Sequence, residues 1–425
     1  MNKKFSLKSF QIILIVLIST LLGYAIGTNT VVLKWQAFRP IVSIQSKTPP
    51  AGQSIDMTLF YDVLSKLNEQ FYDKEKIDNK KILYGAISGM LQSLDDPYTS
   101  FFPPKENSEF KTQLSGEFQG IGAELIASSD GRIIVVAPLD DTPAAKAGVK
   151  SGDTILKVND ESVSGKSLSE VVDKIRGPRG TLVALNIVHL GAAESVNISI
   201  KRDVITIKSA SGWVKNISCS SLCIEDKNGK SISYIRLSQF GDKTNEEWSA
   251  LINDTVQKIN NNKNFKGIIL DLRNNPGGYL NDAVFIASEF IKTGVVVKQE
   301  DTNKKIVTMD VSRKGLLTEY PVIVLMNGGS ASASEIVAGA LADHKRAVLV
   351  GEKSFGKGTV QQAVDVDSGA SVHISVAKWL TPNGTWVDKK GLSPDIEVKF
   401  SQDQDLSKTP FDNQLTRAIK ELLKN

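Results

Sequence analysis

Histidine and cysteine are scarce in this 425-residue chain, which contains three histidines and two cysteines. A structural zinc site needs four clustered nitrogen or sulfur ligands, whereas His189, His344 and His373 are scattered and only Cys219 and Cys223 lie together. The sequence therefore gives no support for a metal centre, and no motif in it points to a cofactor. A catalytic triad built on histidine is also disfavoured.

A concentrated block of basic residues is missing as well. Charged residues make up 23% of the chain, and the net charge of +4 is spread along its length. Nucleic-acid binding proteins usually carry a basic patch or stripe, so a nucleic-acid partner has little support. The length and the 41% hydrophobic content are sufficient for two or three domains with their own cores.

The N-terminus has the pattern of an export segment. Basic residues up to Lys8 precede the apolar segment 10–26, and no further charge occurs before Lys34. As a helix this segment spans roughly 25 Å, near the lower limit for crossing a bilayer. The positive flank predicts a cytoplasmic N-terminus with the remaining chain outside. We interpret the segment as an uncleaved signal anchor, with a cleaved signal peptide ending near Ala25–Gly27 as the alternative.

Composition and periodicity divide the chain into six parts. They are a cytoplasmic tail with a transmembrane anchor (1–33), a linker (34–55), an N-terminal helical region (56–115), a mainly β domain (116–204), an α/β domain (205–400) and a C-terminal helix (401–425).

The mainly β region contains short strand-like runs separated by Gly, Asp and Pro. Its segment Gly120-Ile121-Gly122-Ala123, followed by Pro143–Gly148 and Ser151–Leu156, resembles a PDZ domain. In that family the glycine-containing loop offers N–H groups to the terminal carboxylate of a peptide, and the peptide adds a strand to the sheet. The resemblance therefore implies that Gly120, Ile121, Gly122 and Ala123 bind peptide C-termini.

The region 205–400 alternates strand-like and helix-like runs. Continuous apolar runs at 267–272 and 322–326 predict buried strands, and 245–259, 280–290 and 332–341 predict helices. This alternation is typical of a layered α/β core.

A candidate nucleophile follows the second buried strand. The run Asn327-Gly328-Gly329-Ser330-Ala331-Ser332-Ala333-Ser334-Glu335 enters an alanine-rich helix, so Ser332 is expected near a helix N-terminus. Backbone N–H groups and the helix dipole favour developing negative charge there. The same residues also satisfy the capping-box pattern, with Ser332 and Glu335 in its two positions and no catalytic role at all.

A serine nucleophile needs a base, and two candidates lie downstream. His344 is adjacent to Asp343, but adjacent residues on a helix do not share a face. Lys357 lies between two glycines before a predicted strand, and Gln361 projects to its side without adding charge. A lysine with an ordinary pKa is neutral in about one molecule in 2,500 at pH 7, so burial would have to lower that pKa. A solvated loop lysine is the alternative interpretation.

Motifs from about residue 57 to the C-terminus, taken together, resemble the carboxy-terminal processing proteases, also called tail-specific proteases. The matching segments, in chain order, are Ser93–Tyr98, the PDZ motifs, Ile175–Thr181, Leu270–Gly278, Gly329–Glu335, Gly351–Gly358, Leu380–Gly384 and Gly391–Asp395. This resemblance implies a crotonase-like α/β protease core with an inserted PDZ domain, and a serine endopeptidase that recognises the C-terminal tail of exported proteins.

The same resemblance implies roles for individual residues. Ser332 matches the nucleophile, Lys357 the base and Gln361 its orienting partner. Gly277 and Gly278 match the loop of the oxyanion hole, together with the N–H of Ala333. Asp343 matches an acidic position near the site in some members, and Arg176 matches a PDZ arginine that couples peptide capture to activation.

Three further points remain open at the level of sequence. Cys219 and Cys223 form either a disulfide in an exported protein or two inert thiols. A non-catalytic PDZ adaptor on a protease-like fold and an acyl-CoA-handling enzyme are the alternatives to a protease, whereas no His–Asp–Ser order typical of trypsin-like proteases occurs. The expected partners are proteins or peptides with free C-termini and the membrane, with homo-oligomerisation left undecided.

Overall fold

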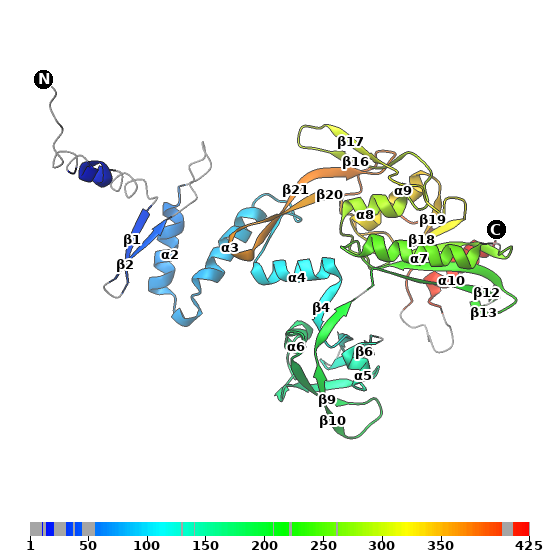
Figure 1. Cartoon of the computed structure of the whole chain (residues 1–425), viewed down its shortest axis with the longest axis horizontal. Coiled ribbons are helices and arrows are strands. Elements are labelled where there is room, and N and C mark those ends of the chain that lie inside the picture. Colours follow the sequence, from blue (N-terminus) through cyan, green and yellow to red (C-terminus); the bar gives the residue numbers. More distant parts are fainter. Residues whose placement is uncertain are drawn as a thin grey trace. The chain divides into compact units, whose positions relative to one another are not determined.

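The structure is a computed structural model that describes residues 11, 14–20, 31–36, 39–44, 56–128, 131–139, 141–206, 208–220, 223–260, 262–401 and 411–424 (Figure 1). It divides into two compact units, residues 1–82 and residues 83–425. In the first unit, β1 (Val31–Gln36) pairs antiparallel with β2 (Arg39–Ile44), and α2 (Thr58–Gln70) and the short helix η1 (Lys74–Lys76) follow. Helix α3 (Asn79–Gln92) begins in this unit and continues into the second.

The expected membrane anchor at 10–26 lies largely outside the described residues. Where it is described, residues 14–20 are helical. In the part of the chain that the structure describes, no helix combines the length and the hydropathy needed to cross a bilayer.

The region 116–204 forms a small β domain with its own core. Its sheet has the strand order β10-β9-β7-β6-β5, and β8 pairs with β7. The strands are β5 (Ala123–Ala127), β6 (Ile133–Pro138), β7 (Thr154–Val158), β8 (Glu161–Ser162), β9 (Leu182–Val188) and β10 (Ser195–Lys201). Alternate residues of β9, such as Val183 and Leu185, are buried together with Val171 of α6 (Leu168–Ile175). The short helix α5 (Pro143–Lys146) lies between β6 and β7 in the sequence.

Two strands connect this domain to the rest of the second unit. Strand β4 (Glu117–Gly120) enters the domain and pairs antiparallel with β11 (Asp203–Thr206), which leaves it. Helix α4 (Pro104–Ser115) directly precedes β4 and ends at Gly116, whose φ of 67° is the left-handed conformation that glycine adopts readily.

The region from residue 210 onward contains a mixed sheet with the order β13-β12-β14-β15-β18-β19-β22. Its strands are β12 (Ala210–Cys219), β13 (Cys223–Glu225), β14 (Lys230–Leu237), β15 (Phe265–Asp271), β18 (Val322–Met326), β19 (Ala347–Gly351) and β22 (Ile396–Glu397). The run from β14 to β22 is parallel, and β12 and β13 are antiparallel additions at one edge. The alternation of strands and helices predicted from the sequence is thus an α/β layered arrangement.

Helices cover both faces of this sheet. Ile268 and Leu270 of β15 are buried with α7 (Thr244–Ile259), α8 (Leu280–Ala287) and α9 (Ala333–Asp343). Ile269, on the opposite face of the same strand, is buried with α10 (Asn413–Leu423). Burial on both faces explains why this strand is a continuous apolar run in the sequence.

A second sheet has the order β17-β16-β21-β20, with β3 (Ser100–Phe102) paired to β21. The strands are β16 (Val295–Glu300), β17 (Ile306–Asp310), β20 (Thr359–Asp365) and β21 (Ser371–Leu380), and the short helix η2 (Asp367–Gly369) joins the last two. This sheet matters for function because Gln361 lies on β20, directly after the segment that contains Lys357.

Candidate active site

Three loops at one edge of the mixed sheet carry the candidate site. Parallel strands β15, β18 and β19 end at the same edge, where α/β proteins usually bind ligands. The loops that follow these strands are residues 272–278, 327–332 and 352–358. They contain the glycines of the expected oxyanion loop, Ser332 and Lys357, respectively, so the fold brings three distant parts of the sequence together.

Ser332 is the N-cap residue of α9, as the sequence predicted. Its φ is 54°, a left-handed conformation that costs a residue other than glycine roughly 1–2 kcal/mol. Such strain persists only where the surroundings impose it, and it is common at functional sites. The residue is partly exposed, so its hydroxyl is on the accessible side of the turn.

The two neighbouring serines are buried, and their hydroxyls form structural hydrogen bonds. The hydroxyl of Ser330 donates to the carbonyl of Leu272 at 2.8 Å, and that of Ser334 donates to the carbonyl of Asn275 at 2.8 Å. Both hydrogen bonds tie the serine loop to the glycine loop. Of the three serines, the middle one is therefore the one suited to attack a substrate.

Glu335 connects the serine and the lysine through the main chain. Its Oε2 accepts hydrogen bonds from the backbone N–H of Ser332 and from that of Lys357, each at 2.9 Å. Its Oε1 accepts from the hydroxyl of Ser354 at 2.6 Å and from the N–H of Gly356 at 2.8 Å. The carboxylate is fully buried. One side chain thus fixes the loop that carries Ser332 against the loop that carries Lys357.

The side chain of Lys357 lies in a mostly uncharged environment. Its Nζ donates to Oε1 of Gln361, whose Nε2 donates to the carbonyl of Tyr98. The Nζ also lies 5.6 Å from the centre of the Tyr98 ring. Burial lowers the pKa of Lys357, and the negative charges of Asp96 and Glu335 oppose this effect. A lowered pKa is what a lysine requires to act as a general base.

The glycine loop lies directly against Ser332. A Cβ on Gly277 would come within 2.8 Å of the Ser332 Cβ and 2.9 Å of the Ala333 nitrogen, so this approach is open only to glycine. The N–H of Gly277 donates to Oδ1 of Asn275 at 2.9 Å. Among the hydrogen bonds of the described residues, the N–H groups of Gly278 and Ala333 have no acceptor. These two N–H groups are therefore free to take another acceptor, while Gly277 provides the close approach.

The structure does not bring Asp343 or His344 to this site. Asp343 is the last residue of α9, and eleven helical residues extend about 16 Å away from Ser332. Its carboxylate accepts from the N–H of Asn383, and the His344 ring contacts the carbonyl of Val295 at 2.7 Å. The helix thus places Asp343 at its opposite end, and a supporting role of Asp343 stays a prediction.

A second candidate site lies in the β domain. The loop Gly120–Ala123 is held by the N–H of Ala144, which donates to Ile121, and by that of Leu139, which donates to Gly122. A Cβ on Gly122 would collide with Thr142 at 2.5 Å, and its φ is +76°, so glycine is required. Strand β5 follows this loop and is the terminal strand of its sheet in the described residues. An edge strand beside a glycine loop is suited to pair with an added peptide strand.

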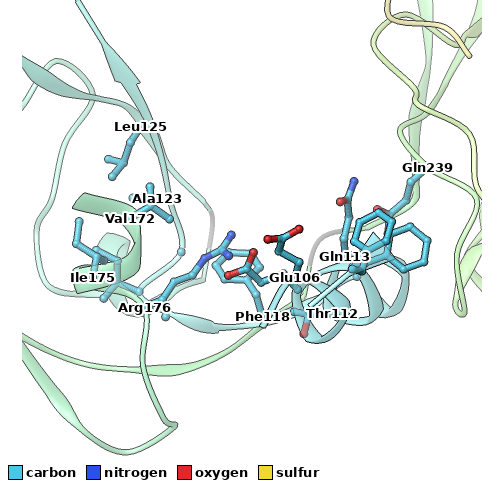
Figure 2. Close-up of a pocket in the computed structure, with 17 residues that line it drawn as sticks. Glu106, Thr112, Gln113, Phe118, Ala123, Leu125, Val172, Ile175, Arg176 and Gln239 are labelled. Atoms are coloured by element: carbon cyan, nitrogen blue, oxygen red, sulfur yellow. The ribbon is translucent and has the colours of Figure 1, made fainter. Parts of the chain in front are cut away.

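This loop opens into a cavity of about 570 Å³ (Figure 2). Figure 2 shows Ala123, Leu125, Val172 and Ile175 of the β domain on one side, and residues of α4 with Gln239 on the other. The lining residues are Phe102, Glu106, Glu109, Phe110, Thr112, Gln113, Gly116, Phe118, Gly120, Ile121, Gly122, Ala123, Leu125, Val172, Ile175, Arg176 and Gln239. The cavity therefore has an apolar groove on the side of the β domain and a mixture of polar and aromatic residues on the other side.

Arg176 lies beside the loop Gly120–Ala123, and its coupling role stays a prediction. It is the C-cap residue of α6, and its side chain passes Gly120. Its guanidinium lies 5.4 Å from the centre of the Phe118 ring, on the strand that leads into the β domain.

Several contributing residues escaped the sequence interpretation. Glu335 was visible only as half of a capping box, and Tyr98 only as part of a matched motif. Asn275 holds the glycine loop through its side chain, which donates to the carbonyl of Leu237 at 2.8 Å. No local sequence pattern predicts such contacts, because the two partners are far apart in the sequence.

Comparisons with known proteins agree with this geometry. The model of peptidase family S41 matches residues 231–398, that of a PDZ domain matches residues 134–188, and that of the N-terminal domain of the activating protease CtpB matches residues 31–105. Over 362 residues the chain is 38% identical to the carboxy-terminal-processing protease of Bartonella bacilliformis, an alignment that covers 84% of this chain and 79% of that protein. The chain belongs to the carboxy-terminal processing proteases of family S41. It is accordingly a serine-type peptidase with a PDZ domain.

Other relatives of this carboxy-terminal processing protease support the assignment. This chain is 38% identical over 356 residues to the carboxy-terminal processing protease CtpA of Bacillus subtilis. The alignment covers 83% of this chain and 71% of that protein. A putative S41 protease from Bacteroides fragilis has a similar fold, with a TM-score of 0.55 and 16% identity over 89% of this chain and 99% of that one.

Proposed function

We propose that this protease cleaves peptide bonds with Ser332 as the nucleophile and Lys357 as the general base. The neutral amine of Lys357 takes the proton of the Ser332 hydroxyl as its oxygen attacks the scissile carbonyl carbon. The tetrahedral intermediate collapses to an acyl-enzyme, and the ammonium of Lys357 returns the proton to the leaving amine. Water then repeats the sequence on the ester and frees the serine.

The observation that carries this proposal is the shared carboxylate of Glu335. By binding the N–H groups of both Ser332 and Lys357, it makes the separation of the two loops a fixed property of the core. Because these bonds use main-chain groups, the side chains of Ser332 and Lys357 remain available for chemistry. The N–H groups of Gly278 and Ala333 supply two donors for the oxyanion.

We further infer that the PDZ domain selects substrates by their C-terminal tail. Charge-assisted hydrogen bonds from the loop Gly120–Ala123 would hold the terminal carboxylate, and the apolar groove formed by Leu125, Val172 and Ile175 would hold the last side chain. Arg176 contributes a positive charge to the same cavity. Substrates with a free, apolar C-terminus are therefore the class that this site fits.

The decisive experiment compares a peptide ending in a free carboxylate with the same peptide amidated at its C-terminus. The full chain should cut the free acid about ten-fold faster or more, because hydrogen bonds to a charged group contribute about 1.5–3 kcal/mol. Ser332→Ala and Lys357→Ala should cut neither peptide, whereas His344→Ala should cut both normally. Turnover by Ser332→Ala would refute the catalytic assignment and leave a different nucleophile to be found.

Arg176→Ala tests whether tail capture also activates the enzyme. If it does, the substitution should reduce the difference in kcat between the two peptides while Ser332 and Lys357 remain intact. A change confined to KM would show that the PDZ domain only tethers the substrate. Tail binding without turnover in the unaltered chain would instead indicate a non-catalytic adaptor.

We also propose that the core has the crotonase-like arrangement that the family resemblance implies.

We further propose that the chain is exported and held at the membrane by its N-terminal segment. The apolar stretch 10–26 behind basic residues supports anchoring. The catalytic part would lie in the periplasm or at the cell exterior, so protease added to spheroplasts should degrade it, and high salt should not release the chain from isolated membranes. Recovery of the full-length chain in the cytosolic fraction would contradict this location.

A further inference from the structure

The first turn of α10 contacts the glycine loop 272–278, which carries the N–H of Gly278. Arg273 is the second residue of that loop, and its Nη1 donates to both carboxylate oxygens of Asp412, at 3.0 and 3.1 Å, and to Oε1 of Gln414 at 3.0 Å. The other side of the guanidinium donates to Asp271 at 2.6 to 3.1 Å. The Arg273 side chain is only 9% exposed, so nearly all its hydrogen bonding depends on these neighbours.

The same turn contacts the loop that carries Lys357. The Nε2 of Gln414 donates to the carbonyl of Val398 at 2.8 Å and to Oε2 of Glu352 at 3.3 Å. Glu352 is the first residue after β19, at the start of the loop that contains Lys357. Gln414 is fully buried, and its hydrogen bonds to Arg273 and Glu352 connect the beginnings of the glycine loop and the lysine loop.

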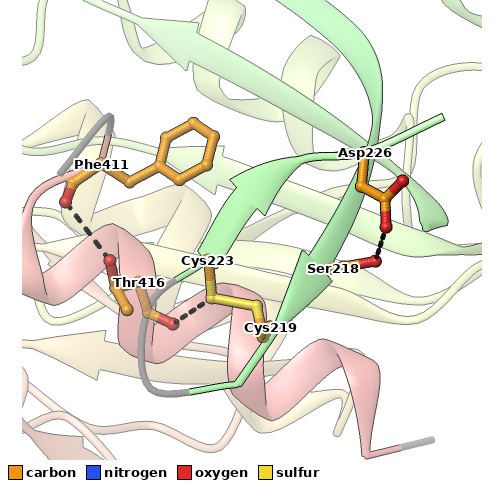
Figure 3. Close-up of a disulfide and its surroundings, with 6 residues drawn as sticks. All are labelled: Ser218, Cys219, Cys223, Asp226, Phe411 and Thr416. Carbon is orange, nitrogen blue, oxygen red and sulfur yellow. Dashed lines mark hydrogen bonds between the residues drawn. A yellow bond between two sulfur atoms is a disulfide. The ribbon is translucent and has the colours of Figure 1, made fainter. Parts of the chain in front are cut away.

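Helix α10 is itself held by the edge of the mixed sheet. A disulfide joins Cys219 and Cys223 across the end of the hairpin formed by β12 and β13, and Cys223 is buried against the helix (Figure 3). Figure 3 shows this bond beside Thr416, with Phe411 at the start of the helix. The Phe411 ring stacks on Trp213 of β12, with ring centres 5.9 Å apart.

We propose that Asp412 and Gln414 are positioning residues for catalysis, and that the C-terminal helix is a working part of the active site. They act through Arg273 on the glycine loop and through Glu352 on the lysine loop. This inference rests on the proposed roles of Gly278 and Lys357, because those are the residues that the two loops carry.

The physical basis is the precision that such a site requires. Between Arg273 and Gly278 the chain has only four residues, so we expect a shift of the guanidinium to displace the N–H of Gly278 as well. Misplacement of a catalytic group by about 1 Å can reduce the rate roughly a hundred-fold. Substrate capture by the PDZ domain uses none of these contacts. The loss should therefore appear in kcat and not in tail affinity.

The test uses the full chain with three substitutions. Asp412→Ser retains a side-chain oxygen to cap α10, as Asp412 does for the N–H of Leu415 at 2.8 Å, but removes the carboxylate that Arg273 binds. Gln414→Met preserves the buried volume and removes both hydrogen-bonding ends. Glu421→Gln, at the last turn of the same helix beside Arg417 and Lys424, is the matched control.

We expect Asp412→Ser and Gln414→Met to lower kcat about 10- to 100-fold with KM within about two-fold, and Glu421→Gln to change neither. Affinity for a peptidyl boronic acid, which forms a tetrahedral adduct on a serine, should fall in parallel with kcat. Affinity for a tail peptide should be unchanged. Because either variant can lose stability, the folded fraction is measured by circular dichroism, and Asp412→Asn, which keeps one hydrogen bond to Arg273, should fall between Asp412→Ser and the unaltered chain.

Two results would overturn the inference. One is normal kcat in folded Asp412→Ser and Gln414→Met; the other is a loss that equals the unfolded fraction. Either result leaves the proposed function standing as long as Ser332→Ala and Lys357→Ala are inactive. Conversely, an active Ser332→Ala would remove the proposed function itself, whatever the α10 variants do.

Discussion

Lys357 and Gln361 form a hydrogen-bonded pair in which the acceptor carries no charge. The Nζ of Lys357 donates to Oε1 of Gln361, and the hydrogen bond from Gln361 to the carbonyl of Tyr98 fixes which end of the amide faces the lysine. An amide oxygen orients the amine without attracting a proton to it as strongly as a carboxylate would. The pair therefore keeps the lysine in place while its pKa stays lowered.

Replacing this amide by a carboxylate should disable the base while preserving the geometry. In Gln361→Glu the negative charge stabilises the ammonium and raises the pKa of Lys357, so the neutral fraction at pH 8 falls about ten-fold for each unit of increase. We expect the rise of kcat/KM with pH to move to higher pH. Gln362→Glu, on the exposed neighbouring position of β20, is the control, and an unshifted profile in Gln361→Glu would contradict the role of the pair.

The unaltered protease should show the pH dependence of a buried lysine. Burial lowers the pKa of Lys357 below its ordinary value of 10.5, so kcat/KM should rise with pH and level off before that value. The folded chain binds fewer protons at this site than the unfolded chain between the two pKa values, so this group makes the free energy of unfolding increase with pH in that window. A kinetic step near pH 6.5 that disappears in a histidine variant would point to another base.

Alanine substitutions of Ser330, Ser332 and Ser334 should differ in their effects on turnover and on stability. Ser332→Ala should abolish turnover with an unchanged thermal unfolding temperature, because its partly exposed hydroxyl contributes little to packing. Ser330→Ala and Ser334→Ala each remove a buried hydrogen bond to the glycine loop, so they should cost about 1–3 kcal/mol of stability and retain measurable activity. Denaturant unfolding and kcat, measured on the same preparations, check both statements. Complete inactivity of folded Ser330→Ala together with an active Ser332→Ala would reverse the assignment.

Helices and strands were predicted best from the sequence where burial gives their apolar residues a regular pattern. Helix α7 lies within one residue of the predicted range 245–259, and strand β18 has the predicted bounds 322–326, because burial gives each element a clear apolar pattern. Strand β12 and most of the second sheet were not predicted, since their half-exposed residues lack a strong pattern. Ser332 and Lys357 were found through motifs, whereas Asp412 and Gln414 were not. Their contacts with Arg273 span more than 130 residues, and only the fold creates them.

Glu335 should be as indispensable as the catalytic pair, for a different reason. Each of its oxygens accepts two hydrogen bonds, so in Glu335→Gln an amide nitrogen must face two donors. Losing two buried hydrogen bonds should cost about 2–6 kcal/mol of stability and reduce kcat strongly. Thermal unfolding and turnover measure the two effects, with Glu319→Gln on the exposed surface as the control. Normal kcat in a folded Glu335→Gln would mean that the loops do not need this carboxylate.

The disulfide provides the last prediction, which concerns stability and not chemistry. Cys219 and Cys223 close a short loop, and restricting the unfolded chain in this way stabilises the fold by about 2 kcal/mol in the chain-entropy model. The double substitution Cys219→Ser/Cys223→Ser should lower the urea midpoint accordingly. At low temperature its kcat should remain within about two-fold of that of the unaltered chain. The reason is that the disulfide contacts α10 near Thr416, one helical turn beyond Asp412, and not at the residues that bind Arg273. Reducing agent should reproduce this shift in the unaltered chain and have no effect on the double variant. An unchanged midpoint in the double variant would show that the hairpin and α10 hold together without the bond, through packing of Phe411 on Trp213.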